Sequence, residues 1–222
     1  MHLVMFDIDG TLVDSAGFDA ALYVEAVRSV LNVEIHSDWN RYEHVSDSGI
    51  LEEVLRRQSL TGDSAALASR VQQHFVGLIR GHLEREPAAV REIAGAKRLV
   101  ERLLDLPNVR VAIATGGWEP TARLKLAHAG IDVERLGFAT SSDARARTDI
   151  MRLAAQRAMG GAAFTRATYF GDGPWDLRAS AELGYDFVAV GNAVSHSVAY
   201  ADLRDTEAIL AGLGMGRRPR GV

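Results

Sequence analysis

The stretch Phe6-Asp-Ile-Asp-Gly-Thr11 decides how the rest of the chain is interpreted. It follows the apolar run Leu3-Val-Met-Phe6, which is typical of a short strand buried on both faces in the middle of a parallel sheet. In an extended chain, residues i and i+2 point to the same side, so Asp7 and Asp9 can face one site while Ile8 faces the core. Two carboxylates this close repel each other unless a cation lies between them. The stretch therefore predicts a buried strand that ends at a charged site.

The remaining sequence divides into a helical block and an alternating block. Apolar residues at helical spacing predict helices over 18–30, 50–55 and 67–83, with no strand pattern between them, and Asp47 is expected to cap the second of these. Strands are predicted at 109–114, 138–140, 167–170 and 187–190, and helices at 97–104, 119–129, 148–158, 175–183 and 206–213. Strands that alternate with helices predict an α/β core with a parallel sheet, here residues 1–15 and 90–222, and an α-helical insert at 16–89.

Composition and charge exclude several classes of protein. The chain of 222 residues has 47% hydrophobic and 24% charged residues, which are ordinary globular values, and a net charge of −4 argues against nucleic-acid binding. The basic tail 216–222 is expected to be a frayed terminus. The chain has no cysteine, and no apolar run reaches the ~18 residues of a membrane span. We therefore expect a cytoplasmic protein without disulfides or membrane contact.

Further polar residues follow two other predicted strands. Thr115, Gly116 and Gly117 come directly after the strand at 109–114, and Asp172 and Asp176 follow the strand at 167–170. Parallel sheets bind ligands beyond the carboxyl ends of their strands, so these groups are expected to meet Asp7 and Asp9. Carboxylates without histidine or cysteine favour a hard cation, Mg²⁺ in particular. The Thr115 hydroxyl and the nearby backbone N–H groups, together with a helix N-terminus near Glu119, suit a phosphate group.

Three segments resemble motifs of the haloacid dehalogenase superfamily of Mg²⁺-dependent phosphohydrolases. These are FDIDGTLVDS at 6–15, AIATGG at 112–117 and YFGDGPWD at 169–176. The resemblance implies a Rossmann-like three-layer core, and it implies that the insert is an α-helical cap domain like that of the phosphoglycolate phosphatase-like subgroup. The implied activity is a phosphatase that acts on a small phosphorylated metabolite, as a monomer or homodimer.

The resemblance also implies a role for each matching residue. Asp7 would attack phosphorus and form an aspartyl-phosphate, and Asp9 would first donate and then accept a proton. Thr115 would bind the phosphoryl group together with Gly116 and Gly117. Asp172 would be a direct ligand of Mg²⁺, Asp176 a direct or water-mediated one, and Asp7 with the Asp9 backbone carbonyl would complete the set.

The third motif of the family supplies a lysine that this chain lacks at the corresponding place. Its two lysines are Lys97, which precedes the second motif, and Lys125, for which the sequence indicates no route to the site. Arg147, just before a predicted helix, is the candidate for the cationic role, and Arg145 is the alternative. Arginine keeps the charge in a larger, forked group.

The same residues bear on other activities of the superfamily. A dehalogenase does not need Asp9, and a phosphonoacetaldehyde hydrolase needs a cap lysine that residues 16–89 lack. A sugar phosphomutase uses the same aspartate pair and stays open as an alternative. A non-catalytic regulatory protein that retains the fold is a third possibility, which only the missing lysine favours.

Overall fold

The computed structural model describes residues 1–15, 17–60 and 62–215. Its centre is a six-stranded sheet in which every pair of neighbouring strands is parallel. In spatial order the strands are β5 (Gly137–Ala139), β4 (Val109–Ala114), β1 (His2–Phe6), β6 (Arg166–Gly171), β7 (Asp186–Val190) and β8 (Ala199–Tyr200). The predicted central position of the first strand is therefore confirmed, and its two neighbours are the strands that precede Thr115 and Asp172.

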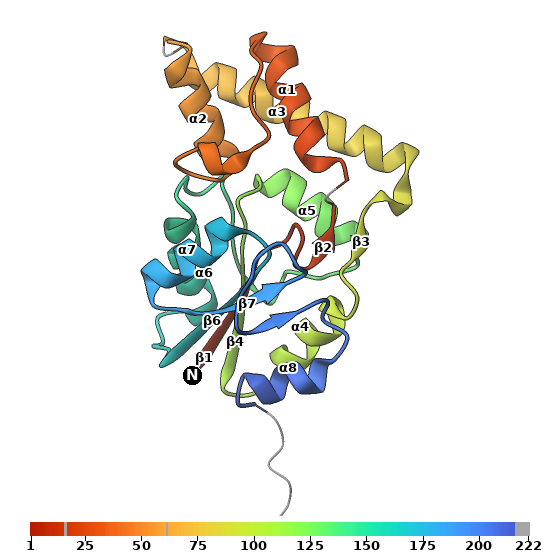
Figure 1. Ribbon diagram of the computed structural model, residues 1–222, viewed down its shortest axis with the longest axis vertical. Coiled ribbons are helices and arrows are strands. Elements are labelled where there is room, and N and C mark those ends of the chain that lie inside the picture. Colours follow the sequence, from red (N-terminus) through yellow and green to blue (C-terminus); the bar gives the residue numbers. More distant parts are fainter. Residues whose placement is uncertain (16, 61, 216–222) are drawn as a thin grey trace, which may run out of the picture.

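Helices cover both faces of the sheet (Figure 1). One face packs against α4 (Ala96–Leu104), α5 (Glu119–His128) and α8 (Thr206–Gly212), and the other against α6 (Arg147–Met159) and α7 (Pro174–Leu183). Along β1, Val4 and Phe6 belong to the first layer of the core, while Leu3 and Met5 belong to the second. All four are fully buried, which explains why this strand is a continuous apolar run. The predicted Rossmann-like three-layer α/β fold is confirmed.

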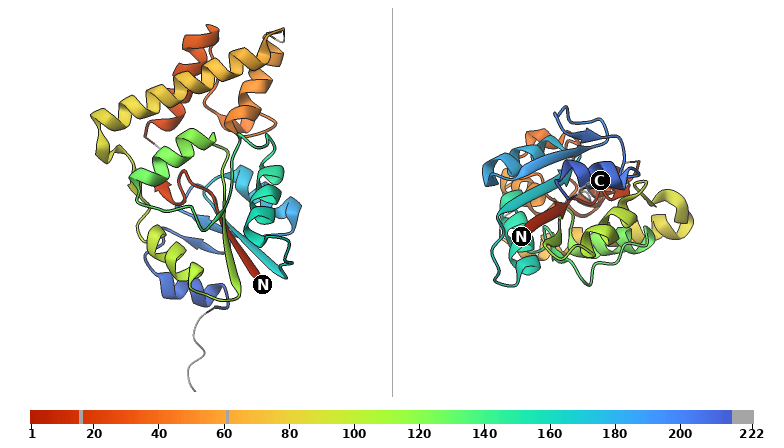
Figure 2. Two further views of the ribbon diagram at one scale, coloured as in Figure 1. Left: turned by 180° about the vertical axis from the view of Figure 1, so that it is seen from behind. Right: turned by 90° about the horizontal axis from the view of Figure 1, so that it is seen from below.

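The helical insert lies beyond the carboxyl end of β1, as Figure 1 and the reverse view in Figure 2 both show. It contains α1 (Asp19–Leu31), α2 (Asp47–Arg57) and α3 (Ser64–Arg85), with the short 3₁₀ helices η1 (Trp39–Arg41) and η2 (Pro87–Ala89). The domain division at 16–89 stays a prediction, and the basic tail lies outside the described residues. No helix in the described ranges is both long enough and apolar enough to cross a membrane.

Two features of this region differ from the sequence prediction. A small antiparallel pair, β2 (Val13–Asp14) with β3 (Arg91–Glu92), joins the two chain crossings between sheet and insert; strands of two residues are too short to show an alternating pattern. The cap of α2 is Ser46, not Asp47: the extended backbone of Ser46 lets its hydroxyl accept the Gly49 N–H at 3.1 Å. Asp47 is the first helical residue, and its carboxylate is free to contact another segment.

Candidate active site

Three adjacent strands deliver acidic and hydroxyl groups to one edge of the sheet. Asp7 follows β1, Thr115 follows β4, and Asp172 follows β6. The chain after β1 still pairs with its neighbour, since the Asp7 N–H donates to the Phe170 carbonyl at 2.9 Å. The sheet therefore fixes the backbone of Asp7, and its side chain emerges at the carboxyl edge, as the sequence predicts.

Three carboxylates converge at this edge. Asp7, Asp172 and Asp176 each offer an oxygen atom, and these atoms all lie within 4.8 Å of one another. Burial and the neighbouring carboxylates raise the pKa of Asp172 to about 8. Burial also raises the pKa of Asp176 to about 7 and raises that of Asp7, although Arg147 opposes both shifts. Three carboxylates that resist ionisation together form a group that could hold a metal ion.

Gly10 explains why the first motif needs a glycine. Its φ angle is +77°, in the left-handed region that glycine adopts without strain. A Cβ atom at this position would lie only 2.1 Å from Asp172 Oδ2. Any larger residue would therefore displace Asp172 from the carboxylate cluster.

Arg147 brings a positive charge to the cluster. Its Nη1 atom lies 3.2 Å from Asp7 Oδ1 and 3.4 Å from Asp176 Oδ1, and its side chain is only 10% exposed. A Cβ atom on Gly116 would lie 2.7 Å from Arg147 Nη2, so this glycine makes room for the guanidinium. The side chain of Arg145 is 62% exposed and pairs with Glu52 on the surface of α2. Of the two candidate arginines, the structure brings only Arg147 to the site.

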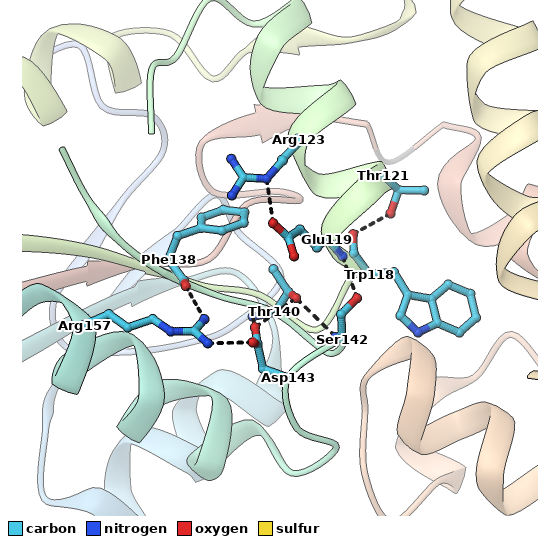
Figure 3. A network of polar contacts seen from close by, with 9 residues as sticks. All are labelled: Trp118, Glu119, Thr121, Arg123, Phe138, Thr140, Ser142, Asp143 and Arg157. Carbon is cyan, nitrogen blue, oxygen red and sulfur yellow. Dashed lines mark hydrogen bonds and ion pairs between the residues drawn. The ribbon is translucent and has the colours of Figure 1, made fainter. Parts of the chain in front are cut away.

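A polar network holds the loop that leads to Arg147 (Figure 3). Asp143 accepts hydrogen bonds from the Thr140 N–H at 2.9 Å and from Arg157 Nη2 at 2.7 Å. Ser142, in the same loop, accepts the Glu119 N–H at the start of α5 at 3.0 Å. The loop is thus tied to both α5 and α6, and this fixes the position from which Arg147 extends to Asp7.

The Asp9 carboxylate turns away from the cluster and toward α5. Its Oδ2 atom accepts a hydrogen bond from Lys125 Nζ at 2.6 Å, and its Oδ1 atom accepts one from the Ser15 hydroxyl. Lys125 also pairs with Asp19, at the start of α1, at 2.9 Å. Burial alone would lower the pKa of Lys125, but Asp19 and Asp9 raise it well above its usual value, so the ammonium stays charged.

The prediction that Lys125 has no route to the site was wrong. The side chain is 1% exposed and reaches Asp9 from the buried face of α5, which also contains Ala122 and Leu126. A signal was present in the sequence, because Lys125 lies within the apolar stripe of its helix and lysine is almost never fully buried unless it is paired. Asp19 gave no such signal, since an acidic residue in the first turn of a helix is ordinary.

The loop after β4 matches its predicted place but not every predicted contact. Thr115, Gly116 and Gly117 line the same cavity as Asp7 and Asp172. However, the Trp118 N–H donates to Asp47 Oδ2 at 2.8 Å, and the Glu119 N–H donates to Ser142. These N–H groups at the N-terminus of α5 already have partners, so the predicted contribution of this helix end to phosphate binding is not supported.

A cavity of about 270 Å³ lies between the carboxylate cluster and the helical insert. Its floor includes Asp7, Asp172, Thr115 and Arg147, and its roof comes from α1, η1 and the start of α2. Ligand pockets range from roughly 300 to 1,000 Å³, so this cavity is at the small end and suits a small metabolite.

Known proteins resemble this chain in sequence pattern and in fold. The family model for haloacid dehalogenase-like hydrolases matches residues 1–184. A hydrolase from Pseudomonas syringae has a similar structure, with 23% identity, coverage of 96% of this chain and 99% of that chain, and a TM-score of 0.72. A β-phosphoglucomutase from Clostridium difficile shares 15% identity over 96% of each chain, with a TM-score of 0.67. A candidate phosphoglycolate phosphatase from Lactobacillus plantarum shares 16% identity over 94% and 97% of the two chains, with a TM-score of 0.57. No curated protein matched the sequence.

Proposed function

The chain belongs to the haloacid dehalogenase-like hydrolases, and we propose that it is a Mg²⁺-dependent phosphatase of a small phosphomonoester. One observation carries the proposal: Asp7 lies at the bottom of a small cavity, beside two further carboxylates and the Arg147 guanidinium. This arrangement combines a nucleophile with groups that offset the charge of a phosphoryl group.

Mg²⁺ is the cofactor that the donor set favours. The cluster contains three carboxylates against one arginine. Burial, together with the neighbouring carboxylates, raises the pKa of Asp172 to about 8 and that of Asp176 to about 7, so a cation bound there would relieve both. Asp7, Asp172 and Asp176, together with the Asp9 backbone carbonyl, would hold the ion. When bound, Mg²⁺ supplies positive charge that lets a carboxylate approach a phosphate dianion.

The first half of the reaction uses Asp7 and Asp9. A carboxylate oxygen of Asp7 attacks phosphorus while the bond from phosphorus to the leaving oxygen breaks, which gives an aspartyl-phosphate and an alcohol. The leaving oxygen takes its proton from the Asp9 carboxyl group. Because Asp9 here contacts Lys125 and Ser15, its side chain must turn toward the cavity for this step.

The second half releases phosphate. Water attacks the phosphorus of the aspartyl-phosphate and transfers a proton to Asp9, and the bond between phosphorus and Asp7 breaks to give inorganic phosphate. Arg147 lies within reach of Asp7 and offsets negative charge on the phosphoryl oxygens in both halves. Thr115 Oγ1 provides a polar contact at the same end of the cavity.

The test is phosphate release from a panel of phosphorylated metabolites with Mg²⁺ present. Asp7→Asn should lower the rate at least about 10³-fold because it removes the nucleophile. Asp14→Asn, an identical change at an exposed residue of β2, is the matched control and should keep the wild-type rate. Activity of Asp7→Asn within tenfold of wild type, or undiminished turnover in excess EDTA, would refute the proposal.

The same assay separates hydrolysis from phosphoryl transfer within a sugar. A phosphomutase would consume a sugar phosphate and return the phosphoryl group to another hydroxyl, so ³¹P NMR would show a new ester and no inorganic phosphate. A phosphatase gives inorganic phosphate in amounts equal to the substrate consumed.

A further inference from the structure

The roof of the active-site cavity is acidic and aromatic. Among the described residues, the insert contributes two carboxylates to it, Asp19 and Asp47, and two aromatic rings, Tyr23 and Trp39. Trp175 adds a third ring from the core. The other described lining residues of the insert are small, aliphatic or serine, and none of them is a lysine, arginine or histidine. The part of the cavity that would receive the leaving group therefore has negative charge and no described cation from the insert.

The two roof carboxylates differ in their partners. Lys125 neutralises Asp19 at 2.9 Å. Asp47 accepts the Trp118 N–H at 2.8 Å, and no described lysine, arginine or histidine lies within 4.0 Å of its carboxylate. The Tyr23 hydroxyl donates to the Asp47 backbone carbonyl at 2.6 Å, which fixes the main chain at the start of α2. Burial and the neighbouring Asp19 raise the pKa of Asp47 to about 8, as expected for a carboxyl group without a cationic partner. Asp47 therefore presents, from a rigid position, a carboxyl group that a cation from a ligand could pair with.

Asp47 lies close to two residues of the proposed reaction, Thr115 and Asp9. A Cβ atom on Gly117 would lie 3.7 Å from Thr115 Oγ1 and 3.9 Å from the Oδ2 atoms of both Asp47 and Asp9. Asp9 is the residue that protonates the leaving oxygen in the proposed reaction. A substituent one or two carbon atoms beyond that oxygen would consequently meet Asp47.

We infer that the leaving alcohol of the substrate carries a positive charge, as in the phosphomonoester of an amino alcohol, and that Asp47 pairs with it. This inference rests on the proposed phosphatase activity. An ammonium group would neutralise Asp47 and lie among aromatic rings, which attract cations through their faces. A carboxylate or second phosphate at the same place would face Asp47 without a compensating cation.

A matched series of two-carbon esters tests the inference. The substrates are 2-aminoethyl phosphate, 2-hydroxyethyl phosphate and 2-phosphoglycolate, which place an ammonium, a hydroxyl or a carboxylate at the same distance from phosphorus. We expect kcat/KM for the ammonium ester to exceed that for the hydroxyl ester at least tenfold, and the carboxylate ester to be the poorest substrate. Preference for the hydroxyl or carboxylate ester would overturn the inference.

Asp47→Asn isolates the charge, because asparagine can still accept the Trp118 N–H. In this variant the ratio of kcat/KM between the ammonium and hydroxyl esters should fall to within about twofold of unity. Ser48→Ala is the control for docking of the insert: it removes the hydrogen bond from Ser48 Oγ to the Ser141 carbonyl (2.5 Å) without changing the charge of the roof, and the ratio should stay at the wild-type value. An unchanged ratio in Asp47→Asn would refute the assignment.

p-Nitrophenyl phosphate separates failure of this inference from failure of the proposed function. Turnover of this ester without preference for the ammonium ester overturns the inference alone. Absence of turnover with p-nitrophenyl phosphate and with all three two-carbon esters, in the presence of Mg²⁺, overturns both.

Discussion

The two ends of the active-site cavity each contain three carboxylates and one buried cation. They differ in how the carboxylates are arranged and in how closely the cation contacts them. The phosphoryl end consists of Asp7, Asp172, Asp176 and Arg147. The leaving-group end consists of Asp9, Asp19, Asp47 and Lys125. At the phosphoryl end the carboxylates converge within 4.8 Å and the arginine approaches two of them at 3.2 and 3.4 Å. At the leaving-group end the lysine contacts two carboxylates at 2.6 and 2.9 Å.

Because of this difference, we expect the phosphoryl end to bind the metal and the leaving-group end to position the proton donor Asp9. At the leaving-group end, Lys125 contacts Asp9 and Asp19 directly, so the protein's own cation pairs with two of the three carboxylates. Burial and neighbouring carboxylates raise the pKa of one carboxyl group at each end to about 8, Asp172 at the phosphoryl end and Asp47 at the leaving-group end. Among the described residues, only the phosphoryl end brings oxygen atoms of three carboxylates within 4.8 Å of one another, so a divalent cation should bind there. Lys125 bridges two carboxylates of the other end, so we expect it to contribute to stability.

The largest expected effect of a single cation is that of Arg147. Arg147→Gln removes the positive charge beside Asp7, and we expect kcat/KM to fall about 10²–10³-fold, or ~3–4 kcal/mol, as when one preorganised electrostatic group is lost from an active site. Arg147→Lys keeps a positive charge but loses the forked guanidinium group, so kcat/KM should fall less than in Arg147→Gln. Steady-state kinetics with the preferred ester measure both.

Arg145→Gln is the control for that experiment. It changes an arginine two residues away, and the one ion pair of this arginine within the described part of the chain is with the exposed Glu52. Its effect should therefore stay within about twofold. Equal losses in the Arg145 and Arg147 variants would show that the positive charge of the whole loop matters, and not the contact with Asp7.

The phosphoryl end could be predicted from the sequence because its residues follow strands directly. Asp7, Thr115 and Asp172 are the first polar residues after buried apolar runs, and the rule that parallel strands end at one edge brings them together. The main strands and helices could be predicted from the spacing of apolar residues along the sequence. Strands of two residues such as β2 did not, since they carry no pattern.

The leaving-group end could not be predicted in the same way. Asp9 follows β1 and was predicted, but the other residues of this end are placed by the packing of helices. Side chains from α1, α2 and α5 meet only in three dimensions. Asp47 illustrates the problem: an acidic residue at a helix start suggests a cap, but Ser46 occupies the position with the extended backbone that a cap needs. Local rules then leave open what the Asp47 carboxylate contacts.

The next largest effect is expected at the leaving-group end, where removal of the Lys125 charge should lower the stability of the fold. Lys125→Met leaves Asp9 and Asp19 without their cation in a buried site, and we expect the free energy of unfolding to fall by about 3 kcal/mol. Because Asp19 and Asp9 raise the pKa of Lys125 above its ordinary value of 10.5, its contribution is fully present below about pH 10 and is lost only as pH rises further. Urea unfolding at pH 7 and pH 9 should give similar losses.

The chain offers its only other lysine as the control. Lys97 is exposed on α4, so Lys97→Met should change the free energy of unfolding by less than about 0.5 kcal/mol. Adding Asp19→Asn to Lys125→Met should recover part of the loss, because it removes one of the two unpaired carboxylates. A Lys125→Met protein as stable as the Lys97 variant would contradict the idea that this end is neutralised by its own cation.

The smallest expected effect is stabilisation by Mg²⁺, and it tests the comparison directly. At a concentration 100-fold above Kd, Mg²⁺ should stabilise the folded protein by about 2.7 kcal/mol, which raises Tm by several degrees. Asp172→Asn should abolish this shift, whereas Asp47→Asn should retain it because the leaving-group end takes no metal.

The pKa of Asp172 is raised to about 8, so the metal-free protein loses stability as pH rises toward that value. The increase in Tm caused by Mg²⁺ should therefore be larger at pH 8.5 than at pH 6. Thermal unfolding at the two pH values measures this, and a shift lost in Asp47→Asn but kept in Asp172→Asn would reverse the assignment of the two ends.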